Sequence, residues 1–291
     1  EGVVFMDRDA RILACNPSAE RILGWSESQL AGRASVDERL TAIHEDGSAY
    51  AVDAHPSIRT LRTGRPCVGV VQGLQNAEGQ RTWISINAQP LQHPWEDKPH
   101  GVVVSFSDIT RLKEAEARLL LEATHDALTG LRNRRHFVER LGAALKVAKR
   151  HGDPLSLCVC DLDAFKQVND THGHATGDAA LQRMAALLRE ELRGEEDLPA
   201  RLGGDEFVVL FPRSSAAQAA VSMERVRRRL QGEPIRTEAG AELVLSGSFG
   251  IAQLAELTTG QEELFEDADR ALYEAKRTGR NRVVIAAERR A

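Results

Sequence analysis

Hydrophobic and polar positions follow two different patterns along the chain and divide it into two parts. Up to about residue 110, apolar positions come in short runs bounded by turn residues, which is typical of strands. From Leu155 onward, short apolar runs alternate with longer segments of helical period. This alternation predicts an α/β sandwich with a central, largely antiparallel sheet. Its expected strands are 155–161, 199–202, 206–211, 243–252 and 282–286, and its expected helices lie near 176–193, 215–231 and 262–277.

The first part carries local signals for its turns and its first helix. Strands at 3–6 and 12–14 flank Asp7-Arg8-Asp9, a pattern that predicts a hairpin. Asn16 precedes Pro17, which suits an early helical position, and Gly24 suits the end of the same helix. Later strands are expected at 68–74, 82–89 and 102–108, with a turn at 76–79.

A charged helix is expected between the two parts, from Asp108 to about Asp126. Positions 109, 112, 116, 119 and 123 follow alternating steps of three and four, the period of a coiled-coil seam. Leu112 and Leu119 fall on this stripe, whereas Glu116 interrupts it. Two readings follow: a helix through which two copies dimerise, or a helical linker in a monomer.

Length and composition fit two soluble domains. The chain has 291 residues, against about 100–200 for a typical domain. Its hydrophobic content of 42% and charged content of 28% are those of ordinary globular proteins. The net charge of −5 provides no global basic field, so we expect no nucleic-acid partner.

The cysteines and the absence of long apolar runs bear on location. Two cysteines are isolated and two lie in the apolar run Cys158-Val159-Cys160, so zinc spacing is absent and reduced thiols are expected. No apolar run reaches the roughly 18 residues of a membrane helix. We therefore expect a cytoplasmic protein. Because the chain begins at Glu1 rather than methionine, we expect a fragment and leave open a membrane segment or sensor upstream.

The run Gly203-Gly204-Asp205-Glu206-Phe207 predicts a hairpin with acids at its tip. A tight two-residue loop needs positive φ, which glycine adopts at little cost. Adjacent side chains of a strand point to opposite faces, so the two carboxylates need not share one task. Carboxylates at an open hairpin tip are natural Mg²⁺ ligands. The same residues are also common in an ordinary surface turn.

A second group of polar residues follows the expected strand 155–161. Asp161 ends this buried strand, and an arrangement in which it faces the hairpin acids would hold two divalent ions near a triphosphate. Backbone N–H groups after Asp163 would cradle phosphates, with Lys166 adding a positive charge. Asn169 and Asp178 offer the amide and carboxylate edges that guanine requires.

These residues belong to a set of runs in which the chain resembles GGDEF-domain diguanylate cyclases over about residues 122–286. The resemblance implies a nucleotide-cyclase, or palm-like, α/β fold. The matching runs are residues 125–135, 161–170, 201–207, 246–250 and 271–281, in the order in which the family carries them.

The resemblance also implies a role for each matching residue. Asp161 and Asp205 would bind Mg²⁺ together with the Leu162 carbonyl, and either Asp205 or Glu206 would deprotonate or orient the 3′-hydroxyl of GTP. The remaining positions would bind substrate: Lys166, Lys276 and Arg280 with the backbone of Ala164 and Phe165 for the triphosphate, and Asn169, His174 and Asp178 for guanosine. Lys166 would also stabilise charge in the transition state. The alternative for Lys276 and Arg280 is a solvated helix end, and for His174 a loop cap.

The implied reaction condenses two GTP molecules into cyclic di-GMP and two pyrophosphates. Each domain would hold one GTP, so a homodimer is required, with two Mg²⁺ ions per active site and Mn²⁺ as an alternative. Two other readings are a non-catalytic GGDEF module that binds nucleotide, and a promiscuous synthase of cyclic GMP–AMP. Intact metal and turn residues argue against the first, and Asp178 argues against the second.

The loop before the hairpin departs from the family pattern. Many relatives carry an inhibitory site for the product, with arginine three residues before an aspartate at the position of Asp197. Here that residue is Gly194, and the arginine is Arg193. If the loop has one extra residue, Glu196 or Asp197 would act with Arg193, near Arg201. Otherwise the inhibitory site is lost.

Residues 1–110 resemble a PAS sensor domain. The residues that carry this resemblance are 16–25, His55-Pro56, Thr63-Gly64 and, at the end of the domain, Asp108-Ile109-Thr110. The implied fold is an antiparallel sheet with helices, joined by a linker helix at 111–124 to the cyclase domain at 125–291. Cys15 is expected to be a packing residue rather than a flavin partner. If the PAS domain bound haem, His44 or His55 would be the ligand of the iron. The sequence does not identify the PAS ligand, nor whether the PAS domain activates or inhibits.

Overall fold

The computed structural model describes all residues except 34–41, 76–80, 195, 238, 256–259 and 288–291. The chain forms two compact units, Glu1–Arg118 and Leu119–Ala291, and each is described by itself. Within the described residues, every helix is too short or too polar to cross a membrane.

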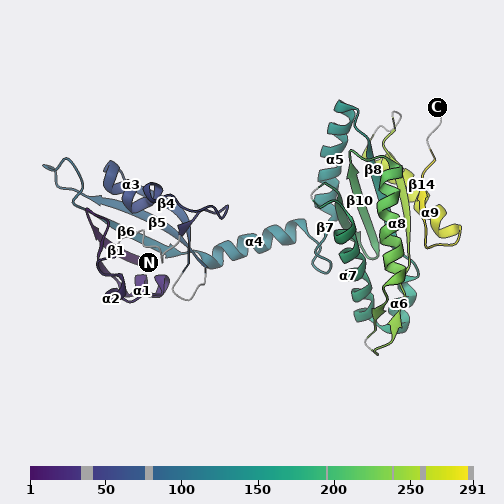
Figure 1. Ribbon diagram of the computed structural model, residues 1–291, viewed down its shortest axis with the longest axis horizontal. Coiled ribbons are helices and arrows are strands. Elements are labelled where there is room, and N and C mark those ends of the chain that lie inside the picture. The colour runs from purple at the N-terminus through teal and green to yellow at the C-terminus, as the bar shows by residue number, and fades with distance from the viewer. Residues whose placement is uncertain (34–41, 76–80, 195, 238, 256–259, 288–291) are drawn as a thin grey trace. The chain divides into compact units, whose positions relative to one another are not determined.

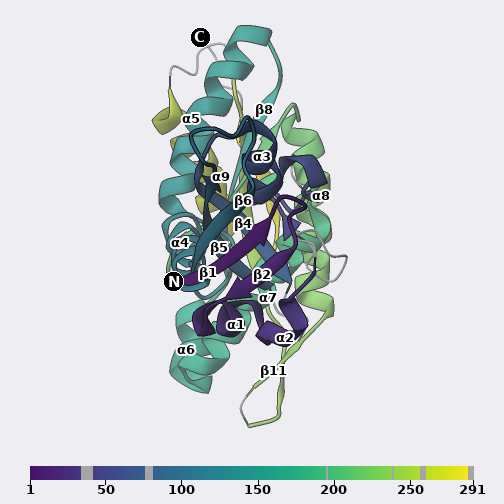
Figure 2. The ribbon, with the colours of Figure 1, turned by 90° about the vertical axis from the view of Figure 1, so that its left-hand side faces the viewer.

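Unit 1 is built on a six-stranded antiparallel sheet in the order β2-β1-β6-β5-β4-β3. The strands are β1 Gly2–Asp7, β2 Ile12–Cys15, β3 Ala42–Ile43, β4 Cys67–Gln75, β5 Arg81–Leu91 and β6 Gly101–Asp108. The short helices lie beside this sheet, α1 and α2 near β1 and β2, and α3 near β4, β5 and β6 (Figures 1 and 2). Their bounds are Pro17–Leu23 for α1, Glu27–Leu30 for α2 and Pro56–Thr63 for α3, preceded by a 3₁₀ turn at Val52–Ala54.

The local predictions for the start of the chain are confirmed. β1 and β2 pair as an antiparallel hairpin. Asn16 caps α1, because its side-chain oxygen accepts a hydrogen bond from the N–H of Ala19 at 2.8 Å. Gly24 ends the helix in the left-handed conformation, with φ of 71°. The turn expected at 76–79 lies outside the described residues.

His55 is a buried histidine at the start of α3 and makes the stability of unit 1 depend on pH. It is 9% exposed, and its Nδ1 lies 2.9 Å from the Ser57 hydroxyl. Burial lowers the pKa of the imidazole from 6.5 to about 4. Between those values the unfolded chain binds a proton that the folded chain does not, so stability falls as the pH falls.

We expect the free energy of unfolding of unit 1 to drop by about 3 kcal/mol between pH 7 and pH 4 through this residue. Urea denaturation of the intact chain at several pH values measures it. His55→Asn removes the titrating group and should flatten the dependence in this window. Equal slopes for wild type and variant would contradict the assignment.

The helix α4, Thr110–Thr124, follows β6 and crosses the boundary between the units. This agrees with the charged helix expected from Asp108 to about Asp126. None of its residues is buried, and Leu112, Leu119, Leu120 and Leu121 are each more than half exposed. The helix therefore presents apolar side chains that unit 1 and unit 2 leave uncovered.

Unit 2 is a six-stranded sheet in the order β14-β13-β8-β10-β9-β7. The four central strands β13, β8, β10 and β9 are antiparallel to one another, whereas β14 and β7 pair in parallel with β13 and β9 at the two edges. The strands are β7 Arg132–Asn133, β8 Leu155–Leu162, β9 Leu198–Gly203, β10 Glu206–Pro212, β13 Gly247–Gln253 and β14 Val283–Ile285, with a separate pair β11 Ile235–Arg236 and β12 Glu242–Leu243. The predicted fold class, with its largely antiparallel central sheet, is confirmed.

Helices cover both faces of this sheet (Figure 1). They are α5 Arg134–His151, α6 Phe165–His172, α7 His174–Glu191, α8 Ala216–Gly232 and α9 Gln261–Arg277. On one face, α7 and α8 enclose a core with Phe207 and Phe249, and on the other α5 and α9 enclose a core with Leu157 and Val208. Cys158 and Cys160 are buried in the first core, as expected for packing residues.

The sequence patterns missed several features of this unit, among them the short strands β7 and β11. Helices α5 and α6 were not predicted, and the run 243–252 is not one strand. It divides into β12, which ends at Leu243, and β13, which begins at Gly247. The two pieces pair with different strands, because β12 pairs with β11 whereas β13 pairs with β8, and the hydrogen bond from the N–H of Asp163 to the Ser246 carbonyl at 2.9 Å continues the β8–β13 register by one residue.

Candidate active site

The hairpin between β9 and β10 places Asp205 in its loop. Gly203 pairs with Glu206, so the loop residues are Gly204 and Asp205 rather than the two glycines of the prediction. Gly203 and Gly204 both have positive φ, 144° and 53°, which explains why glycine suits these positions. The register shifts between Glu206 and Phe207, which marks a bulge. Asp205 is half-buried at the turn and Glu206 is exposed at the first position of β10.

Asp161 near the end of β8 lies directly across from Glu206, because β8 and β10 pair in register at these residues. Their side chains lie on the sheet face that α9 covers. From α9, the Lys276 ammonium reaches the Asp161 carboxylate at 2.8 Å. Burial raises the pKa of Asp161, as do the charges of Asp205 and Asp163, while Lys276 opposes the rise. The hairpin and the end of β8 therefore form one acidic site with a lysine beside it.

The donor set of this site fits a hard divalent cation. Asp161 and Asp205 supply carboxylate oxygens, and the adjacent Leu162 supplies a carbonyl oxygen. The two carboxylates are close enough for the charge of one to raise the pKa of the other. A cation would relieve this repulsion and match the preference of Mg²⁺ for oxygen ligands.

A tight turn follows β8 and starts α6. Ala164 adopts the left-handed conformation with φ of 55°, which is uncommon for alanine, and immediately precedes α6. Phe165 and Lys166 form the first turn of this helix, where backbone N–H groups lack intrahelical partners. Lys166 is exposed. The arrangement suits an anion at the start of the helix.

Asp163 holds this turn in place and was not singled out by the sequence. Its carboxylate accepts hydrogen bonds from the Ser246 and Ser248 hydroxyls at 2.9 and 2.7 Å, and from the N–H of Asn281 at 3.0 Å. Arg280 and Asn281 both have positive φ, so the chain after α9 turns sharply here. Asp163 thus ties the segment that carries Arg280 to the end of β8.

Arg280 belongs to the same region as the turn. It lines a cavity of about 360 Å³ together with Asp163, Ala164 and Ser246. Lys276 lies one helical turn earlier on α9, beside Asp161. The structure therefore brings Lys276 and Arg280 to the acidic site and the α6 turn, respectively.

The predicted guanosine residues meet where α6 and α7 join. A Cβ atom on Gly177 of α7 would lie 1.9 Å from Asn169 Oδ1, so the Asn169 side chain occupies the space that glycine leaves. Asp178 is the next residue of α7 and is exposed. His174 is the first residue of α7 and is exposed as well. Gly177 was missed because its role, leaving room for the Asn169 side chain, depends on how α6 packs against α7.

Gly177→Ala should weaken the GTP binding that the sequence predicts at this junction, without unfolding the protein. The added methyl group must displace the Asn169 amide, whereas alanine favours a helix more than glycine does. We expect the KM for GTP to rise roughly tenfold or more, the value of one or two lost hydrogen bonds. Steady-state kinetics of a double-mutant cycle tests this. Asn169→Ala should give a similar loss, and the double variant should be no worse than either single one; additive losses would refute the mechanism.

The residues expected at an inhibitory site are engaged within the protein. Arg193 donates two hydrogen bonds to the Asp197 carboxylate, from Nε at 3.1 Å and from a terminal nitrogen at 2.6 Å. The Asp197 side chain is fully buried, while that of Arg193 is 47% exposed and also approaches Glu196 at 3.3 Å. Arg201 has different partners, because it pairs with Asp126 at 3.0 Å and donates to the Gly204 carbonyl in the hairpin loop.

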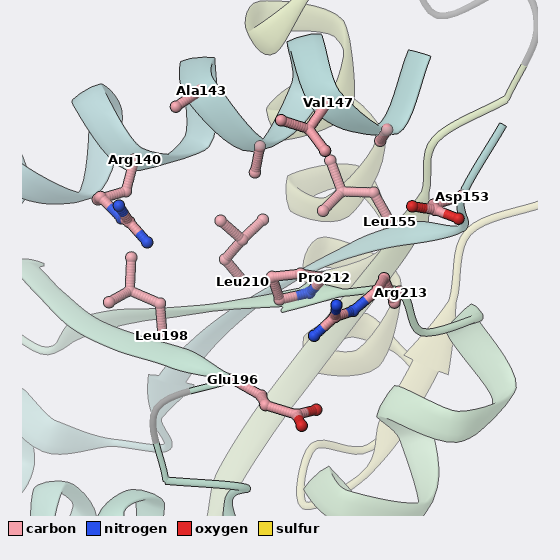
Figure 3. A pocket seen from close by; sticks show the side chains of 12 residues that line it. Arg140, Ala143, Val147, Asp153, Leu155, Glu196, Leu198, Leu210, Pro212 and Arg213 are labelled. Carbon is pink, nitrogen blue, oxygen red and sulfur yellow. The ribbon is translucent and has the colours of Figure 1, made fainter. Parts of the chain in front are cut away.

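A separate cavity of about 300 Å³ lies at the opposite end of β8 from Asp161. Figure 3 shows α5 side chains facing Leu210 and Pro212 across it, with Leu155 at the start of β8 and Asp153 beside it. Its walls are mainly apolar, with Arg140, Arg213 and Glu196 at the edge. It contributes nothing to the acidic site.

The comparison with known families agrees with this geometry. A family profile described as "Diguanylate cyclase, GGDEF domain" matches residues 123–282, and one described as "PAS fold" matches residues 1–109. The chain therefore belongs to the GGDEF diguanylate cyclase family and carries a PAS domain before the family domain.

Relatives of known sequence and structure support the same classification. The chain is similar to the probable diguanylate cyclase DgcC of Escherichia coli, with 36% identity over 75% of this chain and 60% of DgcC. It is 40% identical to the response regulator PleD of Caulobacter vibrioides over 56% of this chain and 36% of PleD. The crystal structure of the coiled coil and GGDEF domain of DgcB from Caulobacter crescentus, in complex with c-di-GMP, has a TM-score of 0.57. It shares 34% identity and covers 61% of this chain and 93% of that one. The chain thus spans less than two thirds of the curated relatives DgcC and PleD.

Proposed function

We propose that this protein is a diguanylate cyclase that condenses two GTP molecules into cyclic di-GMP and releases two pyrophosphates. The observation that carries the proposal is the acidic site, in which Asp161 faces the Gly203–Glu206 hairpin with Lys276 at 2.8 Å. Family membership and the retention of every predicted metal and turn residue favour a catalytic domain over a non-catalytic GGDEF module.

In this mechanism Asp161, Asp205 and the Leu162 carbonyl hold Mg²⁺. Bound there, Mg²⁺ would neutralise the triphosphate and lower the pKa of the attacking 3′-hydroxyl. Lys276 lies close enough to Asp161 to contact a phosphate bound beside it, and the α6 turn with Lys166 and Arg280 supplies further positive charge. Glu206 is the proposed acceptor of the hydroxyl proton, because it is exposed across from Asp161. Catalysis is positioning together with charge neutralisation.

GTP is the proposed substrate because of the α6–α7 junction. Asn169 packs on Gly177 beside Asp178, so an amide and a carboxylate lie on neighbouring surface. A carboxylate accepts hydrogen bonds from guanine N1–H and the 2-amino group, whereas adenine presents no such donor pair. The proposal therefore disfavours cyclic GMP–AMP as the main product.

Product analysis tests the reaction directly. The purified chain is incubated with GTP, with ATP and with both, each with Mg²⁺, and the products are separated by chromatography. We expect cyclic di-GMP and pyrophosphate from GTP alone. Absence of product from GTP would refute the proposal and favour the non-catalytic module, and a mixed dinucleotide would favour the promiscuous synthase.

The proposed regulation acts through a homodimer and α4. One domain holds one GTP, so two acidic sites must meet for each 3′-hydroxyl to reach the other α-phosphate. The start of α4 is bonded to the PAS sheet, since the N–H of Trp83 donates to the Thr110 hydroxyl at 2.9 Å and Asp108 accepts from the N–H of Thr110 at 2.8 Å. Its end is bonded to unit 2, where Asn133 donates to the Ala123 carbonyl at 3.0 Å.

Such a helix can transmit a change in the PAS sheet to the distance between two cyclase domains. Its exposed leucines supply the apolar surface for pairing with a second copy. Sedimentation velocity and specific activity, both measured across a dilution series, test this proposal. Activity per chain should fall as the dimer dissociates, and an activity independent of dissociation would refute the dimer requirement.

Product feedback through the loop before the hairpin is proposed to be lost. Both oxygens of Asp197 are occupied by Arg193, and the carboxylate is buried, so it is unavailable to a guanine base. Initial rates should therefore stay constant when micromolar cyclic di-GMP is added. A falling rate that Arg193→Ala restores would refute this and assign feedback to Arg193 with Glu196.

A further inference from the structure

A cluster of two histidines and a glutamate lies in unit 1, in the connection between β5 and β6. His93, Glu96 and His100 each offer one ligand atom, and these atoms all lie within 4.8 Å of one another. Among the described residues this group plays no part in the acidic site, which belongs to unit 2. His93 is exposed and the other two are partly buried, so a solute can reach the cluster.

The connection is folded so that these three side chains converge. Leu91 and Gly101 pair at its base, and the N–H of His100 donates to the Leu91 carbonyl at 2.9 Å. A turn brings Glu96 back to His93, because the N–H of Glu96 donates to the His93 carbonyl at 3.0 Å. Gln92 fixes the same turn from the side by donating to the Glu96 carbonyl at 2.6 Å.

The side chains themselves are held in contact. Glu96 Oε2 accepts from the backbone N–H of His93 at 2.9 Å and lies 2.7 Å from His100 Nδ1. The rings of His93 and His100 stack with centroids 4.8 Å apart, and Trp95 stacks on His93 at 4.7 Å. The ring of His93 is therefore in contact with both neighbours, and little ordering is needed to bring the donor atoms to one point.

We propose that His93, Glu96 and His100 form a binding site for a transition-metal dication of the Zn²⁺ type. Two imidazole nitrogens and one carboxylate oxygen are three typical Zn²⁺ ligands, and water would complete a four-coordinate site. Ligand atoms about 2.1 Å from such an ion lie roughly 3–4 Å from each other, which small side-chain rotations reach from the present positions. The donor set discriminates against Mg²⁺, which prefers oxygen ligands.

Calorimetric titration of the full chain with Zn²⁺ alone, after chelator treatment and in excess Mg²⁺, tests the site. The excess Mg²⁺ occupies oxygen sites such as Asp161 with Asp205, and a Cys15→Ser background removes the half-buried thiol from competition. We expect one Zn²⁺ per chain. His93→Ala and His100→Ala should each weaken binding by roughly a hundredfold or more, since even an outer-shell partner costs tenfold to a hundredfold.

His44→Ala is the matched control, because His44 belongs to the same unit and stacks on Tyr50 rather than on the cluster. It should bind Zn²⁺ as the parent does. Co²⁺ serves as a second probe, whose visible bands should appear in the parent and the control but not in His93→Ala. Circular dichroism establishes that all variants are folded. Equal Zn²⁺ binding by the parent and His93→Ala, or no binding by either, would leave the cluster as a hydrogen-bonded stack and overturn the proposal.

Discussion

Asp205→Asn should lower the turnover of GTP by roughly a thousandfold while the chain stays folded. The substitution keeps the size of the side chain and removes its charge, so the acidic site keeps only one of its two proposed carboxylate ligands. Asp205 lies in the hairpin loop, whose shape depends on the positive φ of Gly203 and Gly204 rather than on the carboxylate. The melting temperature should therefore remain close to that of the wild type.

The same substitution at the other end of β8 provides the control. Asp153 precedes β8 and lines the cavity of Figure 3, away from Asp161. Initial rates of cyclic di-GMP formation at saturating GTP should be unchanged in Asp153→Asn. Retention of more than a tenth of the wild-type rate by Asp205→Asn would show that the proposed ligand set is wrong.

Gly250→Ala should destabilise unit 2 by about 3 kcal/mol or more. A Cβ atom on Gly250 would lie 2.1 Å from the backbone nitrogen of Leu272 and 2.3 Å from the Ala268 carbonyl oxygen. Both are backbone atoms of α9, so no side-chain rotation relieves the overlap and the helix must move away from β13. Because α9 carries Lys276, this movement should also reduce activity.

Urea denaturation followed by circular dichroism measures the loss. Gly232→Ala is the matched control, since Gly232 ends α8 and a Cβ atom there meets nothing within 4 Å. That variant should match the wild type within about 0.5 kcal/mol. A Gly250→Ala protein of unchanged stability would show that α9 does not pack on β13 as closely as described.

The sequence predicted features that depend on local chemistry. Asn16 and Gly24 bound α1 because a cap and a left-handed residue act on neighbouring atoms. The apolar run of β8 and the acids after it predicted the strand and the approach of Asp161 to the hairpin. The prediction that Gly203 and Gly204 form the loop was wrong, because the register of β9 and β10 places Gly204 and Asp205 there.

The missed features depend on contacts between distant segments. Asp163 was not assigned a role of its own because its partners Ser246, Ser248 and Asn281 are far away in sequence. The division of 243–252 also depends on distant pairing, since β12 pairs with β11 whereas β13 pairs with β8. α5 was missed although Asn133 caps its first turn. No other N-terminal signal precedes the helix, and charged residues are mixed with apolar ones along it.

The partners of Asp163 have a consequence for the order in which the protein is made. They follow it by 83, 85 and 118 residues. A ribosome therefore releases Asp161 and Asp205 long before Asn281, and a nascent chain that has every proposed ligand still lacks the bonds that shape the turn after β8. We expect this domain to become competent only near the end of its synthesis, so a truncated translation product that ends before Asn281 should be silent in second-messenger signalling.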